Sequence, residues 1–180
     1  MSNSNNIFIR FKNMPVDGIA KTVIVATTLC FVCSMVVSFA AVNLKSIQDA
    51  NKAIDKQKNI LQVAGVYYDG INVKQTFSNF EPIVVDLNKG KFTNKFDPLV
   101  FDDKKAAQDP LLSMSLKDDP ASIGRRTNFA TIYLLKNQDG SLDKVILPIH
   151  GYGLWSTLYG FIALEKNCND IFGLQFYQHA

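Results

Sequence analysis

Hydrophobic and polar positions divide the chain into an apolar stretch near its start and alternating patterns near its end. Residues 22–44 form a run of 23 residues without a charged side chain, bounded by Lys21 and Lys45. At about 1.5 Å of rise per residue, a helix of this length is roughly 35 Å long, enough to cross the hydrocarbon core of a bilayer. Few soluble helices remain apolar on every face for so long. The pattern predicts a transmembrane helix over residues 22–44.

The same stretch has a second interpretation. Ser38-Phe39-Ala40 has small residues where a signal peptidase requires them, so a cleaved secretion signal with a mature chain starting at Ala41 is an alternative. Basic residues lie on both sides of the apolar run, and counting them does not decide the orientation. A short polar leader over residues 1–21 and a long segment after the span favour a cytoplasmic N-terminus.

The segment after the span predicts a stalk helix over residues 45–65. Ile47, Ile54 and Leu61 recur at seven-residue spacing, and lysines and aspartates occupy the other faces. Gly65 suits a helix C-cap, because glycine adopts the left-handed conformation that ends many helices. We expect this helix to leave the membrane and dock on the domain that follows.

Residues 66–180 predict an α+β domain built on an antiparallel sheet. Alternating apolar positions separated by turn residues indicate strands, and two pairs of them are joined by short turns. Residues 93–120 are rich in Asp, Lys and Pro, so they read as a surface excursion with a short helix near residues 104–108. The predicted strands are residues 82–92 with their turn, 128–136 paired with 143–150, and 157–166 paired with 170–178.

Composition excludes several classes of protein. A hydrophobic content of 47% with 13 phenylalanines excludes a disordered chain, and a net charge of +3 is too small to indicate nucleic-acid binding. Three cysteines provide no disulfide framework. The two histidines, His150 and His179, lie far apart, and no cluster of His and Cys has the spacing of a metal site.

Several candidate residues have an ordinary explanation beside a functional one. Cys30 and Cys33 could supply half of a four-sulfur site between chains, but inside a bilayer they also pack as small apolar side chains. Cys168 reads as an unpaired thiol in a turn. Arg125 and Arg126 could hold a phosphate or simply begin a strand in solvent.

Two further polar positions remain open in the same way. Asp118 and Asp119 are followed directly by Pro120, which favours a turn. His150 follows a strand, where it either donates a hydrogen bond to a ligand or fills a structural position.

The loop within residues 148–161 combines features that suit a flat ligand. Gly151 and Gly153 allow positive φ and a close approach of backbone amides to a bound group. Trp155, the one tryptophan of the chain, offers a wide aromatic face, and Ser156 and Thr157 offer hydroxyl groups. Either this loop faces a planar ligand with polar edges, or it is a sharp reversal whose indole fills the core.

Three stretches carry a resemblance to a known family. "DKQKNILQVAG" after the span, "GRRTNFATIYLL" and above all "KVILPIHGYGLWSTLYGFIALE" resemble NqrC, the flavin subunit of that name in the sodium-translocating NADH:quinone oxidoreductase. The similarity follows the chain in order from the span to its last residue. The related flavin subunit of the Rnf electron-transfer complex is a more distant relative.

The resemblance implies an anchored flavin domain. Members of the family are held in the bacterial inner membrane by one N-terminal helix, with the N-terminus cytoplasmic and the domain periplasmic. Their FMN, joined to a threonine of a Ser-Gly-Ala-Thr motif, passes electrons in a complex that couples NADH oxidation and quinone reduction to sodium export. The implied partners are the other subunits and membrane lipid. The anchor also argues against cleavage at Ala41.

One departure from the family pattern changes the expectation. No Ser-Gly-Ala-Thr sequence occurs in the 180 residues, and the Glu-Thr-Pro-Gly-Leu-Gly segment of the family would begin where this sequence stops. We therefore expect the chain to correspond to about the first two-thirds of an NqrC protein, apparently truncated at its C-terminus. We expect flavin to bind this chain weakly and without a covalent bond, or to be absent from it.

The sequence leads to one hypothesis about the site, with alternatives. Electron transfer by a flavin needs no nucleophile or general base from the protein, and no catalytic residue is predicted. The alternatives are a membrane-anchored interaction module without a cofactor, an electron-transfer protein like the Rnf flavin subunit, and a secreted hydrolase, for which no nucleophile and base are evident. The residues expected on the flavin side are His150, Gly151, Gly153, Leu154, Trp155 and Ser156.

Overall fold

The structure is a computed structural model that describes residues 14–15 and 18–179. Most of the leader predicted over residues 1–21 lies outside the described residues. The chain divides into two compact units, residues 1–51 and residues 52–180, and each is described by itself. Helix α2, Ile19–Val63, contributes to both units.

The first unit is the apolar part of helix α2. Of the helices in the described part of the chain, α2 is the one that is long and apolar enough to cross a membrane, with a mean hydropathy of 2.4 in its most apolar stretch. Large apolar side chains such as Leu29, Phe31 and Phe39 are exposed along this unit. By length and composition, a helix that is apolar on all faces matches a segment that crosses a membrane.

The predicted C-cap of this helix is confirmed. Helix α2 ends at Val63, and Gly65 has the left-handed conformation with φ of 74°. The amide of Gly65 donates to the carbonyl of Gln62 at 3.0 Å, and the amide of Val66 donates to the carbonyl of Leu61 at 3.0 Å. These two bonds satisfy carbonyl groups that the last helical turn would otherwise leave unpaired.

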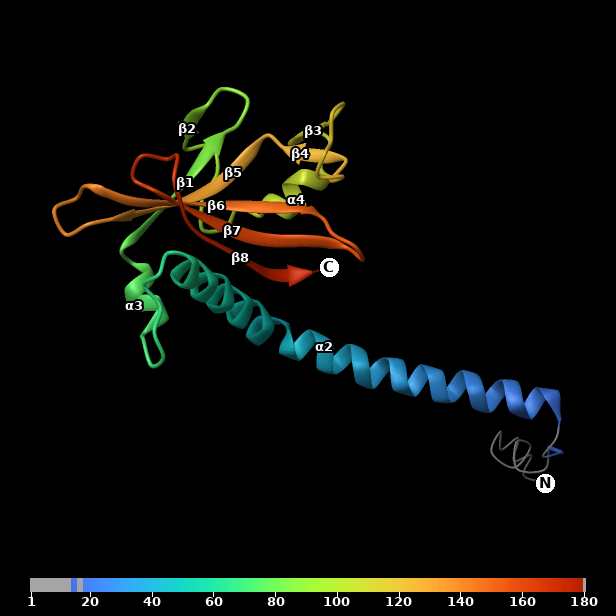
Figure 1. Ribbon diagram of the computed structural model, residues 1–180. Helices are drawn as coiled ribbons and strands as arrows, with labels where there is room; N and C mark the ends of the chain where they lie inside the picture. Colours follow the sequence, from blue (N-terminus) through green and yellow to red (C-terminus); the bar gives the residue numbers. More distant parts are fainter. Residues whose placement is uncertain (1–13, 16–17, 180) are drawn as a thin grey trace. The chain divides into compact units, whose positions relative to one another are not determined.

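The second unit is built on a six-stranded antiparallel sheet with the strand order β2-β1-β5-β6-β7-β8 (Figure 1). The two strand pairs expected from the sequence, β5 with β6 and β7 with β8, are both present. The predicted α+β class is confirmed. The strands are β1 Phe80–Asp86, β2 Lys91–Thr93, β5 Phe129–Lys136, β6 Leu142–Tyr152, β7 Thr157–Glu165 and β8 Ile171–His179.

Smaller elements complete the unit. Helix α3 is Val73–Phe77 and helix α4 is Asp103–Gln108, which confirms the short helix expected near residues 104–108. The side chain of Asp102 caps α4 by accepting hydrogen bonds from the amides of Lys104 and Lys105. A two-stranded sheet pairs β3, Ser113–Ser115, with β4, Arg125–Thr127, and the sequence pattern had not predicted it.

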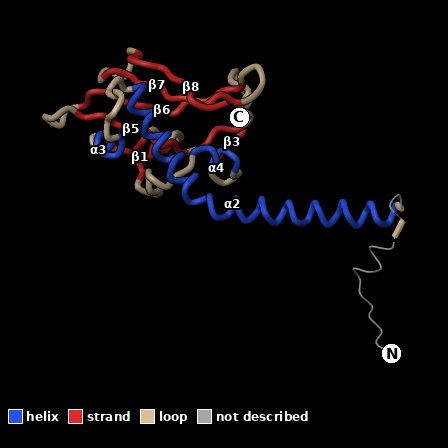
Figure 2. Tube along the Cα trace, turned by 90° about the horizontal axis from the view of Figure 1, so that it is seen from below, coloured by secondary structure: helices blue, strands red, loops and turns tan. Residues whose placement is uncertain are grey.

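The core lies between one face of the large sheet and the last turns of α2. Ile60 and Leu61 of α2 are fully buried and belong to one cluster with Ile146 and Phe161 of the sheet. Figure 2 shows the end of α2 lying against the strands. The seven-residue stripe is buried only in part: Leu61 lies in the core, whereas Ile47, which belongs to the first unit, is exposed.

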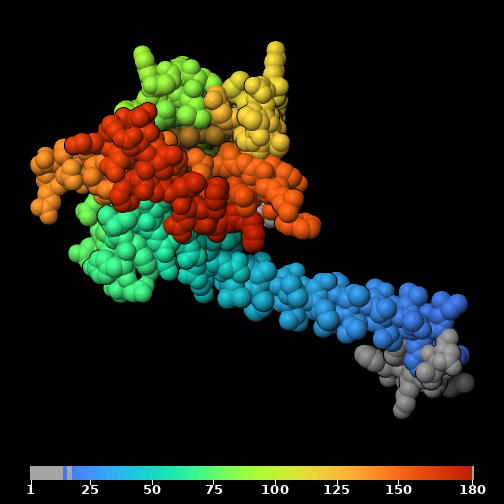
Figure 3. All heavy atoms as spheres, viewed as in Figure 1, coloured from blue at the N-terminus to red at the C-terminus, as the bar shows by residue number. Residues whose placement is uncertain are grey.

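Strand β8 forms one edge of the sheet and lies at the surface in the space-filling view (Figure 3). Its nine residues include no Lys, Arg, Asp, Glu or Pro. Leu174 and Phe176 are each more than half exposed. Natural sheet edges usually carry a charge or a proline that prevents another strand from pairing with them, and β8 has neither.

The close approach of α2 to β8 gives the first prediction. A methyl group on Gly173 would lie 2.6 Å from the carbonyl oxygen of Val63, closer than van der Waals contact allows. We expect Gly173→Ala to lower the free energy of unfolding by about 2 kcal/mol, because the end of the helix must move away from the sheet. The matched control is Gly151→Ala, whose new methyl group would come no closer than 3.7 Å to another side chain. Denaturant unfolding of both variants measures the difference, and equal stabilities would contradict the prediction.

Candidate functional site

The glycine-rich loop predicted to face a ligand is the tight turn between β6 and β7. Tyr152 and Thr157 form the last pair of the hairpin, and the amide of Gly153 donates to the carbonyl of Ser156 at 2.8 Å. Leu154 and Trp155 stand at the tip with 88% and 89% of their surface exposed. The indole therefore does not fill the core, which was one of the two explanations for its position.

The role expected of the two glycines is wrong in one respect. Neither Gly151 nor Gly153 has a positive φ, since Gly151 continues strand β6 and the left-handed glycines lie elsewhere in the described chain. Gly153 is needed for space instead. A Cβ atom at this position would lie 3.0 Å from the side chain of Leu158, so glycine lets that leucine pack against the backbone of the turn.

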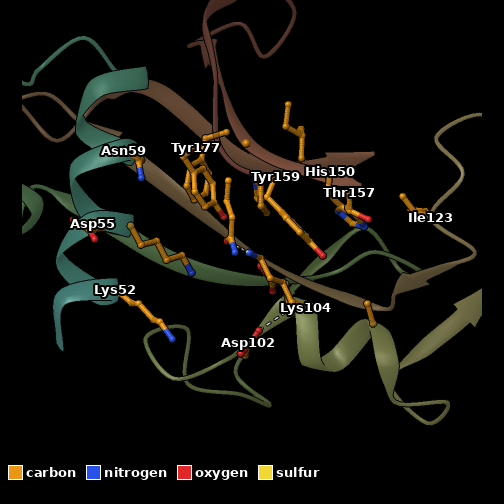
Figure 4. Close-up of a pocket in the computed structure, with 18 of the residues that line it drawn as sticks. Lys52, Asp55, Asn59, Asp102, Lys104, Ile123, His150, Thr157, Tyr159 and Tyr177 are labelled. Carbon is orange, nitrogen blue, oxygen red and sulfur yellow. Dashed lines mark hydrogen bonds between the residues drawn. The ribbon is translucent and has the colours of Figure 1, made fainter. Parts of the chain in front are cut away.

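His150, two residues before the end of β6, lines a cavity of about 1080 Å³ (Figure 4). The other five residues predicted for the site do not line it. The walls come from the last turns of α2, the start of α4, the segment before β4 and the facing parts of strands β6, β7 and β8. The cavity lies entirely within the second unit. Its volume is at the upper end of the range of small-molecule sites.

Stacked aromatic rings form one wall of the cavity. The rings of His150 and Tyr159 stack with centroids 5.7 Å apart, and those of Phe161 and Tyr177 stack with centroids 5.1 Å apart. The ammonium group of Lys104 lies 3.7 Å from the centroid of the Tyr159 ring and donates to Oε1 of Gln178 at 2.6 Å. A cation over a ring face is stabilised by the quadrupole of the ring.

Burial determines the protonation of the groups on this wall. It lowers the pKa of Lys104, and the charge of Lys56 lowers it further. Burial also lowers the pKa of His150, with a contribution from Lys104, so the imidazole is neutral at pH 7. A neutral imidazole has one nitrogen that donates a hydrogen bond and one that accepts, so His150 can pair with either a donor or an acceptor on the polar edge of a ligand.

A second group of ionisable residues lies where α2 meets α4. Burial raises the pKa of Asp103 to about 6, although the charge of Lys56 and a hydrogen bond from the amide of Thr131 act in the opposite direction. Burial alone would lower the pKa of Lys56, but Tyr133 and Asp103 outweigh it and the pKa is raised. Lys56 therefore stays charged at neutral pH.

The remaining candidates take ordinary structural positions. Arg125 lies in β4, where its guanidinium group donates to the hydroxyl groups of Ser113 and Ser115. Asp119 accepts hydrogen bonds from the amides of Ile123 and Gly124, which confirms the turn expected there.

The cysteines and possible metal ligands add no further site to the described part of the chain. Cys168 lies exposed in the turn before β8 with φ of 55°, and Cys30 and Cys33 lie on α2. Among residues 14–15 and 18–179, no group of three or more His, Cys, Asp or Glu residues is placed to hold a metal ion.

Sequence reasoning missed most of the cavity. Its polar residues come from segments far apart in the sequence, and only their fold brings them together. One local signal was available: the run Asp102-Asp103-Lys104-Lys105 marks the start of a short helix with an unusual density of charge. The other residues that matter most are Lys56, Tyr159 and Tyr177.

Comparisons with known proteins identify relatives of one kind, the NqrC subunits of Na(+)-translocating NADH-quinone reductases. The chain is 46% identical over 169 residues to the protein of Pseudomonas aeruginosa and 42% identical over 165 residues to that of Haemophilus ducreyi. These alignments cover 91% and 90% of this chain but 64% and 63% of the relatives, so the chain spans less than two thirds of their length. No family model matches the chain.

Solved structures agree with these relatives. NqrC of Shewanella oneidensis superposes with a TM-score of 0.68 at 33% identity, over 73% of this chain and 61% of that one. The corresponding subunit of Parabacteroides distasonis superposes with a TM-score of 0.56 at 25% identity, over 76% of this chain and 58% of that one. The family resemblance found in the sequence is confirmed.

The pKa of Asp103 gives the second prediction. A carboxyl group whose pKa is raised by folding stabilises the protein below its unfolded pKa of 3.8 and loses that contribution as the pH rises through about 6. Asparagine at this position is neutral at every pH, so Asp103→Asn does not lose this contribution. As the pH rises from 4 to 7, we expect the free energy of unfolding of Asp103→Asn to increase by up to about 3 kcal/mol relative to that of the unsubstituted chain. Denaturant unfolding at each pH measures this, and a difference that does not change with pH would contradict it.

Proposed function

We propose that this chain, which belongs to the NqrC family of the sodium-translocating NADH-quinone reductases, is a membrane-anchored flavin subunit of such a complex. The observation that supports this best is the 46% identity to the Pseudomonas aeruginosa protein over 169 residues. In this role the chain carries electrons within a complex that couples NADH oxidation and quinone reduction to sodium export. Its partners are the other subunits, and it has no turnover of its own.

The proposed arrangement places the apolar residues 22–44 across the bacterial inner membrane as a single anchor. The N-terminus is cytoplasmic and the domain is periplasmic. Exposed apolar side chains along the first unit support a lipid environment for this stretch. A retained anchor keeps the flavin domain at the membrane, where the other subunits of the complex lie.

The described residues fit a flavin in two respects. The exposed indole of Trp155 offers a flat face on which an aromatic ring system can stack. Trp155 lies at the tip of the β6–β7 hairpin, and both strands of this hairpin line the cavity. His150 and the hydroxyl group of Thr157 lie on the cavity wall below that tip, where polar groups can meet the edge of a ring or a sugar-like chain (Figure 4). When bound, FMN supplies reversible one-electron chemistry.

The task of the protein residues is to bind and orient this ring system. We assign the stacking surface to Leu154 and Trp155, with Gly151, Gly153 and Ser156 shaping the turn and His150 supporting it from the cavity. The contacts that these residues can supply are stacking on the indole and hydrogen bonds from the imidazole and the hydroxyl group.

Flavin binding at the hairpin tip is the third prediction. We expect the fluorescence of Trp155, the one tryptophan of the chain, to be quenched when FMN is added to the chain in detergent. We expect Trp155→Leu to weaken FMN binding about fivefold, because a stacked ring pair contributes on the order of 1 kcal/mol. Flavin fluorescence polarisation measures this change. Phe92→Leu is the matched control, since Phe92 is also an exposed aromatic residue but lies on β2. Equal loss of FMN binding in Trp155→Leu and Phe92→Leu would contradict the assignment of the stacking surface to the hairpin tip.

The orientation in the membrane is the fourth prediction. Cys168 is exposed in a turn of the second unit, whereas Cys30 and Cys33 lie within the apolar stretch. We expect a membrane-impermeant maleimide to label intact spheroplasts at Cys168, and Cys168→Ser to abolish the labelling. Labelling that requires permeabilised membranes would place the domain in the cytoplasm instead.

A further inference from the structure

Helix α4 is a short element that forms part of the cavity wall. It has six residues, and the side chains of its cap and first turn, Asp102, Asp103 and Lys104, all line the cavity. Figure 4 shows Asp102 and Lys104 at the start of this helix. A helix of this length is not stable by itself in water, so contacts with the rest of the second unit hold it in place.

Two polar contacts attach the first turn of α4 to the large sheet. Oδ1 of Asp103 accepts a hydrogen bond from the amide of Thr131 on β5 at 3.2 Å, and Lys104 donates to Oε1 of Gln178 on β8 at 2.6 Å. The contact with β5 is the more buried one. Thr131 has no exposed surface, and its hydroxyl group has no hydrogen-bond partner among the described residues. Asp103 therefore joins α4 to an inner strand at a position with few polar groups.

The charged groups around Asp103 come from the elements that pack against it. Asp102 precedes it on α4 and opposes its charge, whereas Lys56 on α2 attracts it. On β5, Tyr133 interacts with Lys56, and Arg125 of β4 is engaged with the serine hydroxyl groups of β3. None of the ion pairs in the described part of the chain includes Lys56 or Asp103. In its ionised form, the carboxyl group thus has one hydrogen bond and no direct counter-ion, which is too little to replace water around a buried charge.

We propose that the carboxyl group of Asp103 is a pH-sensitive contact, which holds α4 against the sheet when it is neutral and releases the helix when it is ionised. Local opening of α4 brings the carboxylate into water and removes the cost of keeping its charge buried. The same movement separates Lys104 from Gln178 and from the ring of Tyr159, so part of the cavity wall opens with the helix. The contact controls access to the cavity, and this role does not depend on the proposed flavin function.

The direction of the pH dependence follows from the two environments of this carboxyl group. In the closed helix, burial raises the pKa of Asp103 to about 6, whereas in the open helix the group is in water with its ordinary pKa of 3.8. The closed form binds the proton more tightly, so the contact has its full strength below pH 3.8 and loses it as the pH rises through about 6. With these two values, the equilibrium constant for opening of α4 increases up to about fiftyfold between pH 4 and pH 7 and levels off above that.

Hydrogen exchange followed by mass spectrometry, on the chain in detergent, measures this opening. After correction for the effect of pH on the intrinsic exchange rate, the amides of α4 should open more often as the pH rises, while those of β6 in the core stay protected. Asp103→Asn keeps an acceptor for the amide of Thr131 but cannot ionise, so it should remove the pH dependence and keep α4 closed at pH 7. The matched control is Asp118→Asn, which removes an exposed carboxylate before β4 and should behave like the unsubstituted chain.

Lys56→Met distinguishes an electrostatic role from a merely structural one. Without this cation, the pKa of Asp103 in the closed helix rises further, so the increase in opening should continue to higher pH and become larger. If this variant does not fold, the unsubstituted chain and Asp103→Asn decide the question. Three results would overturn the proposal: opening of α4 that does not change between pH 4 and pH 7, a pH dependence that persists in Asp103→Asn, or exchange of α4 only together with β6.

Discussion

The docking of the last turns of α2 on the sheet is the contact on which the rest of the second unit depends. Ile60 and Leu61 are fully buried against Ile146 and Phe161, and Gly173 lets the helix end approach the edge strand. Because a helix repeats about every four residues, fixing Ile60 also fixes Lys56 on the same side, one turn earlier. A hydrophobic contact therefore places a charged group in the cavity.

The second constraint is the way in which strands β5 and β6 separate. They are paired at Tyr133 and Ile146, but β5 begins four residues earlier, at Phe129, without a partner in β6. Helix α4 contacts this part of β5, and the carboxylate of Asp103 accepts a hydrogen bond from the amide of Thr131. This hydrogen bond connects α4 to β5, and the hydrogen bond from Lys104 to Gln178 connects α4 to β8. The aromatic wall and its cation thus come from the same junction.

The sequence predicted the local elements well because each has a local cause. The uncharged run of residues 22–44 and the cap at Gly65 fix the long helix, while alternating apolar residues fix β5 to β8. The small sheet of β3 and β4 was not predicted, since three-residue strands leave almost no periodicity. Of the residues expected at the site, only His150 lines the cavity. In the sequence, Lys56 looks like one more charge on a helix surface, and only the packing of Ile60 and Leu61 shows that it lines the cavity.

The uncharged edge of β8 has a consequence for what can pair with the large sheet. Its outward amides and carbonyls have no partner in the described part of the chain, and the exposed side chains of Leu174 and Phe176 lie on the same strand. A further extended segment, from the same polypeptide or from a partner, can add to this edge by backbone hydrogen bonds, and no like charge opposes it. A segment that also carries apolar side chains would shield Leu174 and Phe176 from water.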